Sequence, residues 1–154
     1  MNKLILARFR DYVQHNYRDA DMTTHTICSV LDCSKTYLHD LLKRECGCAA
    51  MEYVRYFRIL KSIELIFDGK TKVYLHVGYK TSAAFSNAFF NITGFYASCF
   101  YASELEKHKE IIFVAYNIAA ECPKKALQFI TNNSSIRAIL SEQQNKIDSN
   151  SSKK

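Results

Sequence analysis

An all-α fold is predicted for this chain of 154 residues, and three observations support the prediction. Apolar residues recur every three to four positions through most of the length, which is the period of a helix with one buried face. Polar residues that begin helices stand directly before these stretches, and Gly47 and Gly94 stand directly after two of them. No segment alternates polar and apolar residues in the way that predicts a sheet.

The first helix is expected at residues 2–17, where apolar positions recur at helical spacing. These positions are Leu4, Ile5, Phe9, Val13 and Tyr17. Thr23 or Thr24 is expected to cap a short second helix that runs to about Leu31, since a threonine hydroxyl accepts from the free N–H groups at a helix start. Its expected buried positions are Ile27, Val30 and Leu31.

A third helix is expected from Lys35 to about Cys46, with Ser34 as its N-cap and Gly47 at its end. Its inward positions are Leu38, Leu41 and Leu42, and its outward positions are Lys35, Thr36, His39, Asp40 and Lys43. The second and third helices, about residues 24–46, therefore have the form of a helix-turn-helix. In this motif the second helix enters the major groove of DNA.

A long helix follows at about residues 49–67, and Asp68-Gly69-Lys70 interrupts it. A brief apolar stretch at 73–77 precedes a helix over 83–93, which Thr81 or Ser82 caps and Gly94 ends. Beyond it we expect an apolar helix at 111–120, a helix from Pro123 to about Leu140, and a solvated, disordered tail at 149–154.

Composition sets wide limits on function. Lys and Arg exceed Asp and Glu by six, a balance that suits nucleic acid or an anionic membrane but serves solubility equally well. No apolar run reaches the roughly 18 residues of a membrane span, so we expect no membrane association. The start of the chain lacks the pattern of a signal peptide. We therefore expect a cytoplasmic location and reduced thiols for the six cysteines.

The stretch SKTYLHDLLKRECGCAAMEYVRYFRILKS, residues 34–62, resembles the AraC/XylS family of bacterial transcription regulators. The DNA-binding unit of that family has two helix-turn-helix motifs joined by a long helix. The residues that carry the resemblance are Ser34, Tyr37, Leu38, Lys43, Arg44, Glu45, Gly47, Met51, Glu52, Tyr53 and Arg58. The stretch VGYKTSAAFSNAFFNITG, residues 77–94, resembles the family's second motif in its Gly-Tyr pair, its Phe-Ser-x-Ala-Phe core and its closing Thr-Gly.

The resemblance implies a domain organisation. Residues 1–103 form the DNA-binding domain, with motifs at about 24–46 and 72–94 and the linker helix at about 49–67. Residues 104–148 form a helical extension of unknown role. Because no separate sensing or dimerisation domain precedes residue 1 in this sequence, the chain is similar to the short, monomeric members.

Helix face and resemblance together assign the DNA contacts. Those expected to meet base edges are Thr36, His39 and Asp40 in the first motif and Ser82, Ala83, Ser86 and Asn87 in the second. Those expected to meet phosphates are Ser34, Lys35, Lys43, Arg44, Arg55, Arg58 and Lys80. For Arg55 and Arg58 the alternative is an ion pair with a carboxylate such as Glu52.

Three features depart from the family pattern. The approach to the second motif, between Glu64 and Gly78, is about three residues shorter, so its first helix should be stunted. Neutral or apolar residues, Asn87, Phe90 and Asn91, replace the usual basic ones. Asp40 puts a carboxylate on the first recognition helix, where it repels phosphate but can accept from cytosine N4.

We therefore expect a sequence-specific regulator that binds double-stranded DNA mainly through its first motif, and activation through RNA polymerase is what the resemblance implies. The alternative is a protein-interaction module, or decoy regulator, with weakened DNA binding. No nucleophile and base stand at suggestive spacing and no glycine-rich phosphate loop is present, so no enzyme, cofactor or metal site is predicted.

Overall fold

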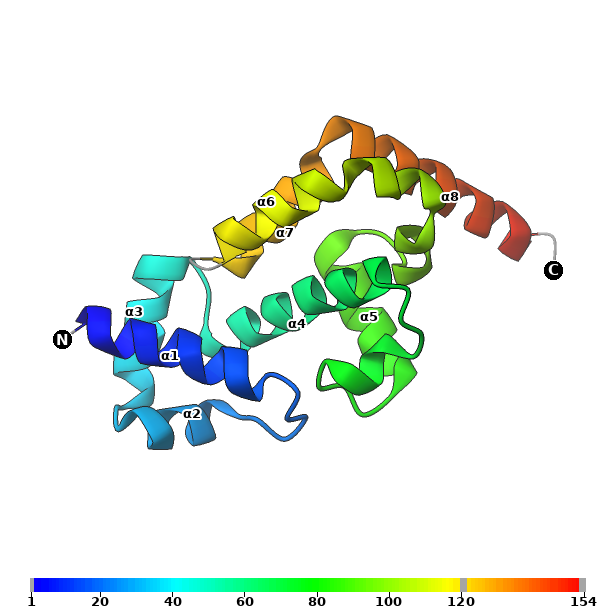
Figure 1. The fold of residues 1–154 in the computed structure, drawn as a ribbon. Helices are drawn as coiled ribbons and strands as arrows, with labels where there is room; N and C mark the ends of the chain where they lie inside the picture. Colours follow the sequence, from blue (N-terminus) through cyan, green and yellow to red (C-terminus); the bar gives the residue numbers. More distant parts are fainter. Residues whose placement is uncertain (1, 120–121, 153–154) are drawn as a thin grey trace.

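The computed structural model describes residues 2–119 and 122–152, and every regular element in this part of the chain is helical. The α-helices are α1 (Asn2–Asn16), α2 (Thr24–Leu31), α3 (Lys35–Cys46), α4 (Ala50–Phe67), α5 (Ser82–Thr93), α6 (Lys109–Ala119), α7 (Pro123–Asn132) and α8 (Ser134–Ser152). Three 3-10 helices, η1 (Val73–His76), η2 (Ala97–Tyr101) and η3 (Ser103–His108), connect them. The predicted all-α class is confirmed, and α4 runs through the middle of the molecule (Figure 1).

Helices α1, α2 and α3 and the first turns of α4 enclose one hydrophobic core. Phe9 and Val13 of α1 are fully buried there, in the same cluster as Leu38 and Leu42 of α3. Burying one such side chain contributes roughly 1.5–3 kcal/mol, so this face of α1 holds α3 firmly in place.

Two expected core residues lie outside this core. Leu4 is 60% exposed and Val30 is 48% exposed, while Leu6 and Cys28 are buried. Leu6, Phe9 and Val13 are spaced by three and four residues and share one helix face, from which Leu4 is rotated away. The sequence contained more apolar positions than one face of α1 can bury.

Side-chain caps begin the two helices of the first motif and the last helix of the second. The hydroxyl of Thr23 accepts from Thr26 N at 3.2 Å and that of Ser34 from Tyr37 N at 3.1 Å. The hydroxyl of Thr81 accepts from Ala84 N at 3.1 Å. Where the sequence offered two candidates, the earlier threonine is the cap, because the cap residue must lie in extended backbone just outside the helix.

The second half of α4, with η1 and α5, forms another hydrophobic core that the C-terminal extension completes. The buried side chains that the extension contributes are Leu105, Ile112, Ala115, Ala126, Leu127, Ile130, Ile136 and Leu140. Figure 1 shows α6 and α7 side by side above α4, with α8 leading away to the C-terminus. The extension is thus a structural part of this core, and a domain boundary at residue 103 stays a prediction.

Two expectations for the C-terminal region were wrong. The single helix expected from Pro123 to Leu140 is broken at Asn133, whose backbone is extended and whose side-chain oxygen accepts from Ile136 N at 3.1 Å. Asn133 therefore caps a new helix instead of continuing the old one. The tail expected to be disordered at 149–154 is helical through Ser152, and residues 153 and 154 lie outside the described part.

Candidate nucleic-acid interface

The first motif is a helix-turn-helix in the structure. Asp32 forms the turn in the left-handed region at φ 53°, which Asp tolerates better than most residues. Cys33 N donates to Cys28 O at 3.2 Å and closes the turn. Cys28 is buried in the core that α2 shares with α3.

All seven predicted contacts of the first motif lie at the surface of α3 or at its N-cap. They are Ser34, Lys35, Thr36, His39, Asp40, Lys43 and Arg44. The inward leucines of α3 are buried, so the helix presents a continuous polar face to solvent. Their roles at base edges or phosphates stay predictions.

Two of these cations already have carboxylate neighbours. Lys43 Nζ lies 3.7 Å from Glu52 Oε1, and Arg44 Nε lies 3.3 Å from Glu45 Oε1. Glu52 thus pairs with Lys43, and not with Arg55 or Arg58 as the sequence had suggested. Exposed pairs of this kind contribute about 0–1 kcal/mol. A phosphate can therefore replace either carboxylate at little cost.

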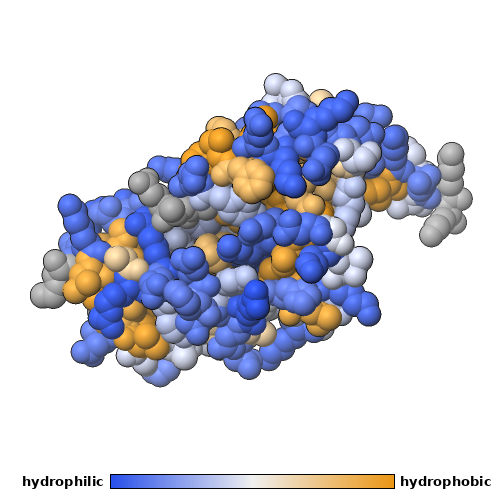
Figure 2. All heavy atoms as spheres, viewed as in Figure 1, coloured by the Kyte–Doolittle hydropathy of each residue, from blue (hydrophilic) through white to orange (hydrophobic). Residues whose placement is uncertain are grey.

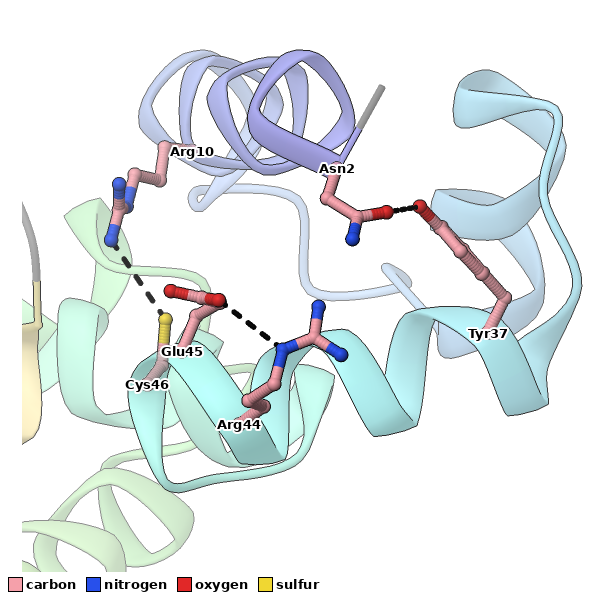
Figure 3. A network of polar contacts seen from close by, with 6 residues as sticks. All are labelled: Asn2, Arg10, Tyr37, Arg44, Glu45 and Cys46. Carbon is pink, nitrogen blue, oxygen red and sulfur yellow. Dashed lines mark hydrogen bonds and ion pairs between the residues drawn. The ribbon is translucent and has the colours of Figure 1, made fainter.

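Helix α1 positions α3 through polar contacts at both ends of α3 (Figure 3). The Tyr37 hydroxyl, near the start of α3, donates to the side-chain oxygen of Asn2. Arg10 Nη2 donates to the Cys46 sulfur at 3.9 Å, at the end of α3. Figure 3 also shows the side chains of Arg44 and Glu45 turned toward each other. Helix α3 is therefore held in place by these polar contacts with α1 as well as by the hydrophobic core.

The second motif is reduced, as expected from the short approach. Its first helix is only η1, four residues long, and α5 is its recognition helix. The predicted base-facing residues Ser82, Ala83, Ser86 and Asn87 are all exposed on α5. No charged residue occurs in α5, so it offers phosphates only N–H, hydroxyl and amide groups.

Lys80, a predicted phosphate contact, is engaged in an ion pair. Its Nζ lies 2.7 Å from Asp21 Oδ1, in the loop between α1 and α2. The hydrogen bond between them lowers the pKa of Asp21 and raises that of Lys80 from their ordinary values. Both side chains are exposed, so the pair joins the two motifs only at the surface.

Comparison with known proteins agrees with this geometry. A family model described as a helix-turn-helix domain matches residues 27–102. The structure is similar to the C-terminal domain of AraT, a response regulator from Geobacillus stearothermophilus, with a TM-score of 0.60 and 27% sequence identity. The match covers 63% of this chain and 83% of that one. Residues 27–102 form an AraC-type helix-turn-helix domain. No curated protein matches the chain.

The AraC-type domain makes the chain a DNA-binding transcription regulator. Within the described residues no group of three or more His, Cys, Asp or Glu is arranged to hold a metal ion. None of the described helices combines the length and the apolar character needed to cross a membrane.

One predicted contact of the AraC-type domain is wrong. Arg58 is only 6% exposed, and its guanidinium donates to the backbone carbonyls of Tyr17 and Asp19. It cannot reach a phosphate without leaving these partners. Arg55, on the same helix, is exposed and stays a predicted phosphate contact.

The structure adds surface residues that the sequence reasoning missed. His25 and Ser29 of α2 line an open hollow together with Ser34 and Lys35 at the start of α3. Their spacing of four residues, opposite the buried face of α2, was the signal that could have found them. In the second motif Tyr96 is exposed as well, and its ring stacks on that of the exposed Phe90 with centroids 5.1 Å apart.

Proposed function

We propose that this regulator binds a specific double-stranded DNA sequence by inserting α3 into the major groove. Thr36, His39 and Asp40 then meet base edges, while Lys35 and Lys43 lie beside phosphates. The observation that carries the proposal is the outer surface of α3, which is exposed and polar. Ser34 and Arg44 complete the phosphate contacts at the two ends of the helix.

The charge on the two recognition helices supports α3 as the main anchor. Phosphate neutralisation supplies nearly all of the non-specific affinity of DNA-binding proteins and a large share of the specific affinity. Three of the exposed residues of α3 are cations, Lys35, Lys43 and Arg44, whereas α5 has no charged residue. Arg55 on α4 and Lys80 before α5, once released from Asp21, add two contacts outside α3. The second motif then contributes base contacts from Ser82, Ala83, Ser86 and Asn87.

We further propose that the protein acts as a monomer and activates transcription by contacting RNA polymerase. The family resemblance supports this role. Figure 2 shows apolar residues gathered over α6 on a largely hydrophilic face. Phe113 and Val114 of α6 are exposed in the structure. An exposed apolar helix face offers a protein contact away from α3.

The test of DNA binding compares two double variants on a duplex selected from a random pool by the wild-type protein. Lys43→Ala with Arg44→Ala should lower affinity for all sequences and reduce the slope of log K against log salt by about two. Lys107→Ala with Lys125→Ala removes the same charge from exposed positions in the extension and should leave that slope unchanged. Equal slopes for the two double variants would refute the role of α3.

A protein-interaction role is the second candidate, and the uncharged α5 with its exposed Phe90 and Tyr96 favours it. In that case wild-type affinity for the selected duplex would not exceed the non-specific range, about 10⁻⁴ to 10⁻⁶ M. Phe90→Ala with Tyr96→Ala would then abolish the binding of a purified regulator or polymerase partner. Tight, sequence-dependent DNA binding by wild type would exclude this candidate as the main function.

A further inference from the structure

A buried arginine joins the loop of the first motif to the linker helix. Arg58 of α4 donates from Nε to Tyr17 O at 2.9 Å and from Nη2 to Asp19 O at 2.7 Å. These carbonyls belong to the segment that follows α1, about 40 residues away in the sequence. A buried charge needs such partners, because removing it from water without hydrogen bonds is costly. Arg58 therefore fixes this loop against α4.

Two residues at the start of the second motif, Gly78 and Tyr79, lie against the guanidinium of Arg58. Gly78 has φ +85°, and a Cβ there would lie 2.4 Å from Tyr17 O and 2.8 Å from Arg58 Nε. Only glycine fits this backbone position without displacing both groups. The Tyr79 ring lies 5.6 Å from the Arg58 guanidinium carbon, within the range of a cation–π contact. We call these five residues, Tyr17, Asp19, Arg58, Gly78 and Tyr79, the Arg58 junction.

The Arg58 junction is connected to both recognition helices. Tyr79 packs on Phe85 of α5, with ring centroids 5.7 Å apart. On the other side, the loop that holds Tyr17 and Asp19 leads from α1 into α2, and both helices share the core of α3. In Figure 1, α3 and α5 lie near opposite ends of α4. Without the junction, α4 would be the main connection between the two motifs, and each could pivot on it.

We infer that Arg58 is a positioning residue that fixes the distance and angle between α3 and α5, and with them the spacing of the two DNA segments that the protein binds at once. The inference rests on the proposed binding of DNA by both helices. Because Arg58 is buried and its guanidinium contacts both the loop after α1 and the start of the second motif, it acts on DNA only through the helices that it holds. Its effect is therefore on spacing and not on the count of phosphate contacts.

The DNA experiment measures tolerance to spacing. Duplexes derived from one selected by the wild-type protein carry one, two or five extra base pairs between the segments that α3 and α5 contact. Wild type should lose at least tenfold in affinity for one extra pair, and Arg58→Met should lose less than threefold. Arg58→Lys keeps the charge and one donor direction and should fall between them. The salt slope of Arg58→Met should equal that of wild type, whereas Arg55→Met should lower the slope and keep the spacing preference.

A second measurement does not depend on DNA. Spin labels on ketone-bearing unnatural residues at positions 39 and 87 report the distance between α3 and α5 in the full chain. Wild type should give one narrow distance distribution, and Arg58→Met, or Arg58→Lys if Arg58→Met does not fold, should give a broader one. An unchanged distribution would overturn the inference, as would a folded Arg58→Met that keeps the wild-type spacing preference. If wild type selects no DNA, the proposed function fails and the distance measurement alone decides the role of Arg58.

Discussion

At the scale of single residues, three thiols lie close together where the end of α3 meets the start of α7. Cys46, Cys48 and Cys122 are all buried, and the Cys122 thiol donates to Cys46 O at 3.5 Å. Burial, together with the smaller effect of the neighbouring sulfurs of Cys46 and Cys122, raises the pKa of the Cys48 thiol from 9.0 to about 12. A thiol that keeps its proton is a poor nucleophile, so Cys48 acts as a small apolar core residue.

This protonation makes folding stability depend on pH. The unfolded chain loses the Cys48 proton near pH 9.0, while the folded chain keeps it to about pH 12. Above pH 9 the unfolded state therefore binds fewer protons than the folded state, and the free energy of unfolding falls as pH rises toward 12. Urea midpoints at pH 8, 9, 10 and 11 should fall more steeply for wild type than for Cys48→Ala. Parallel pH profiles for the two proteins would show that Cys48 titrates normally.

Arg58 shows what residue patterns leave undetermined. Arg55, Arg58 and Lys61 follow one another at intervals of three residues in α4, and the helical period predicted that this side of the helix would face solvent. Periodicity describes the helix alone, however, and it carries no information on which loop covers a face. In the structure Arg58 donates to the carbonyls of Tyr17 and Asp19, which follow α1, and is buried there. Arg55 has no such cover and is exposed.

At the scale of elements, the two recognition helices have the same length and the same kind of cap but different surfaces. Each has 12 residues, a hydroxyl N-cap and a glycine C-cap in the left-handed region. They differ in charge, since α3 carries cations and α5 has no charged residue. Fold and function are therefore separable in α5, whose buried Phe85 and Phe89 keep the helix in place whatever its outer face holds.

This separation predicts a gain of DNA binding. Asn87→Lys and Asn91→Lys place one cation each on the exposed face of α5 and should leave the buried face intact. Each should steepen the slope of log K against log salt by about one. Gln128→Lys adds the same charge to an exposed position on α7 and should not change the slope. If all three variants bind alike, α5 does not lie along DNA.

Element boundaries followed the sequence closely where local chemistry sets them. Hydroxyl caps and left-handed glycines determined the ends of α3 and α5, and these were predicted. The break at Asn133 was not, because an asparagine can sit within a helix or cap the next one, and the choice depends on packing. In the structure Ile136 and Leu140 of α8 are buried in the core that the extension completes, and the stability gained by burying them favours a break at Asn133.

At the scale of the whole molecule, α4 is shared by two cores. Its Tyr53 and Val54 belong to the core of the first motif, and its Ile59 and Ile63 belong to the core that the extension completes. The family resemblance ended near residue 103, so it gave no account of the extension. The structure accounts for the apolar residues beyond that point, because they are buried in the same core as residues of α4, α5 and η2.

The C-terminal extension is expected to stabilise the DNA-binding half of the molecule. Ile130 is fully buried in the second core, while its neighbour Phe129 on α7 is 41% exposed. Ile130→Ala should lower the free energy of unfolding by about 2–4 kcal/mol, from lost burial and the cavity left behind. Phe129→Ala should cost less than about 1 kcal/mol, because its ring is already in contact with water. Urea unfolding followed by circular dichroism gives both values.

Where in the molecule Ile130→Ala lowers stability is as informative as how much stability it removes. Since α4 joins the cores, we expect the amides of Leu38 and Leu42 in α3 to open only with the fold as a whole, so Ile130→Ala should also speed their hydrogen exchange. The curve should keep a single transition. If α3 stayed protected while a separate early transition appeared, the extension would be an independent unit and α4 would not transmit its stability. If both cores instead lose stability together, the extension is needed to hold α3 in the position from which it binds DNA.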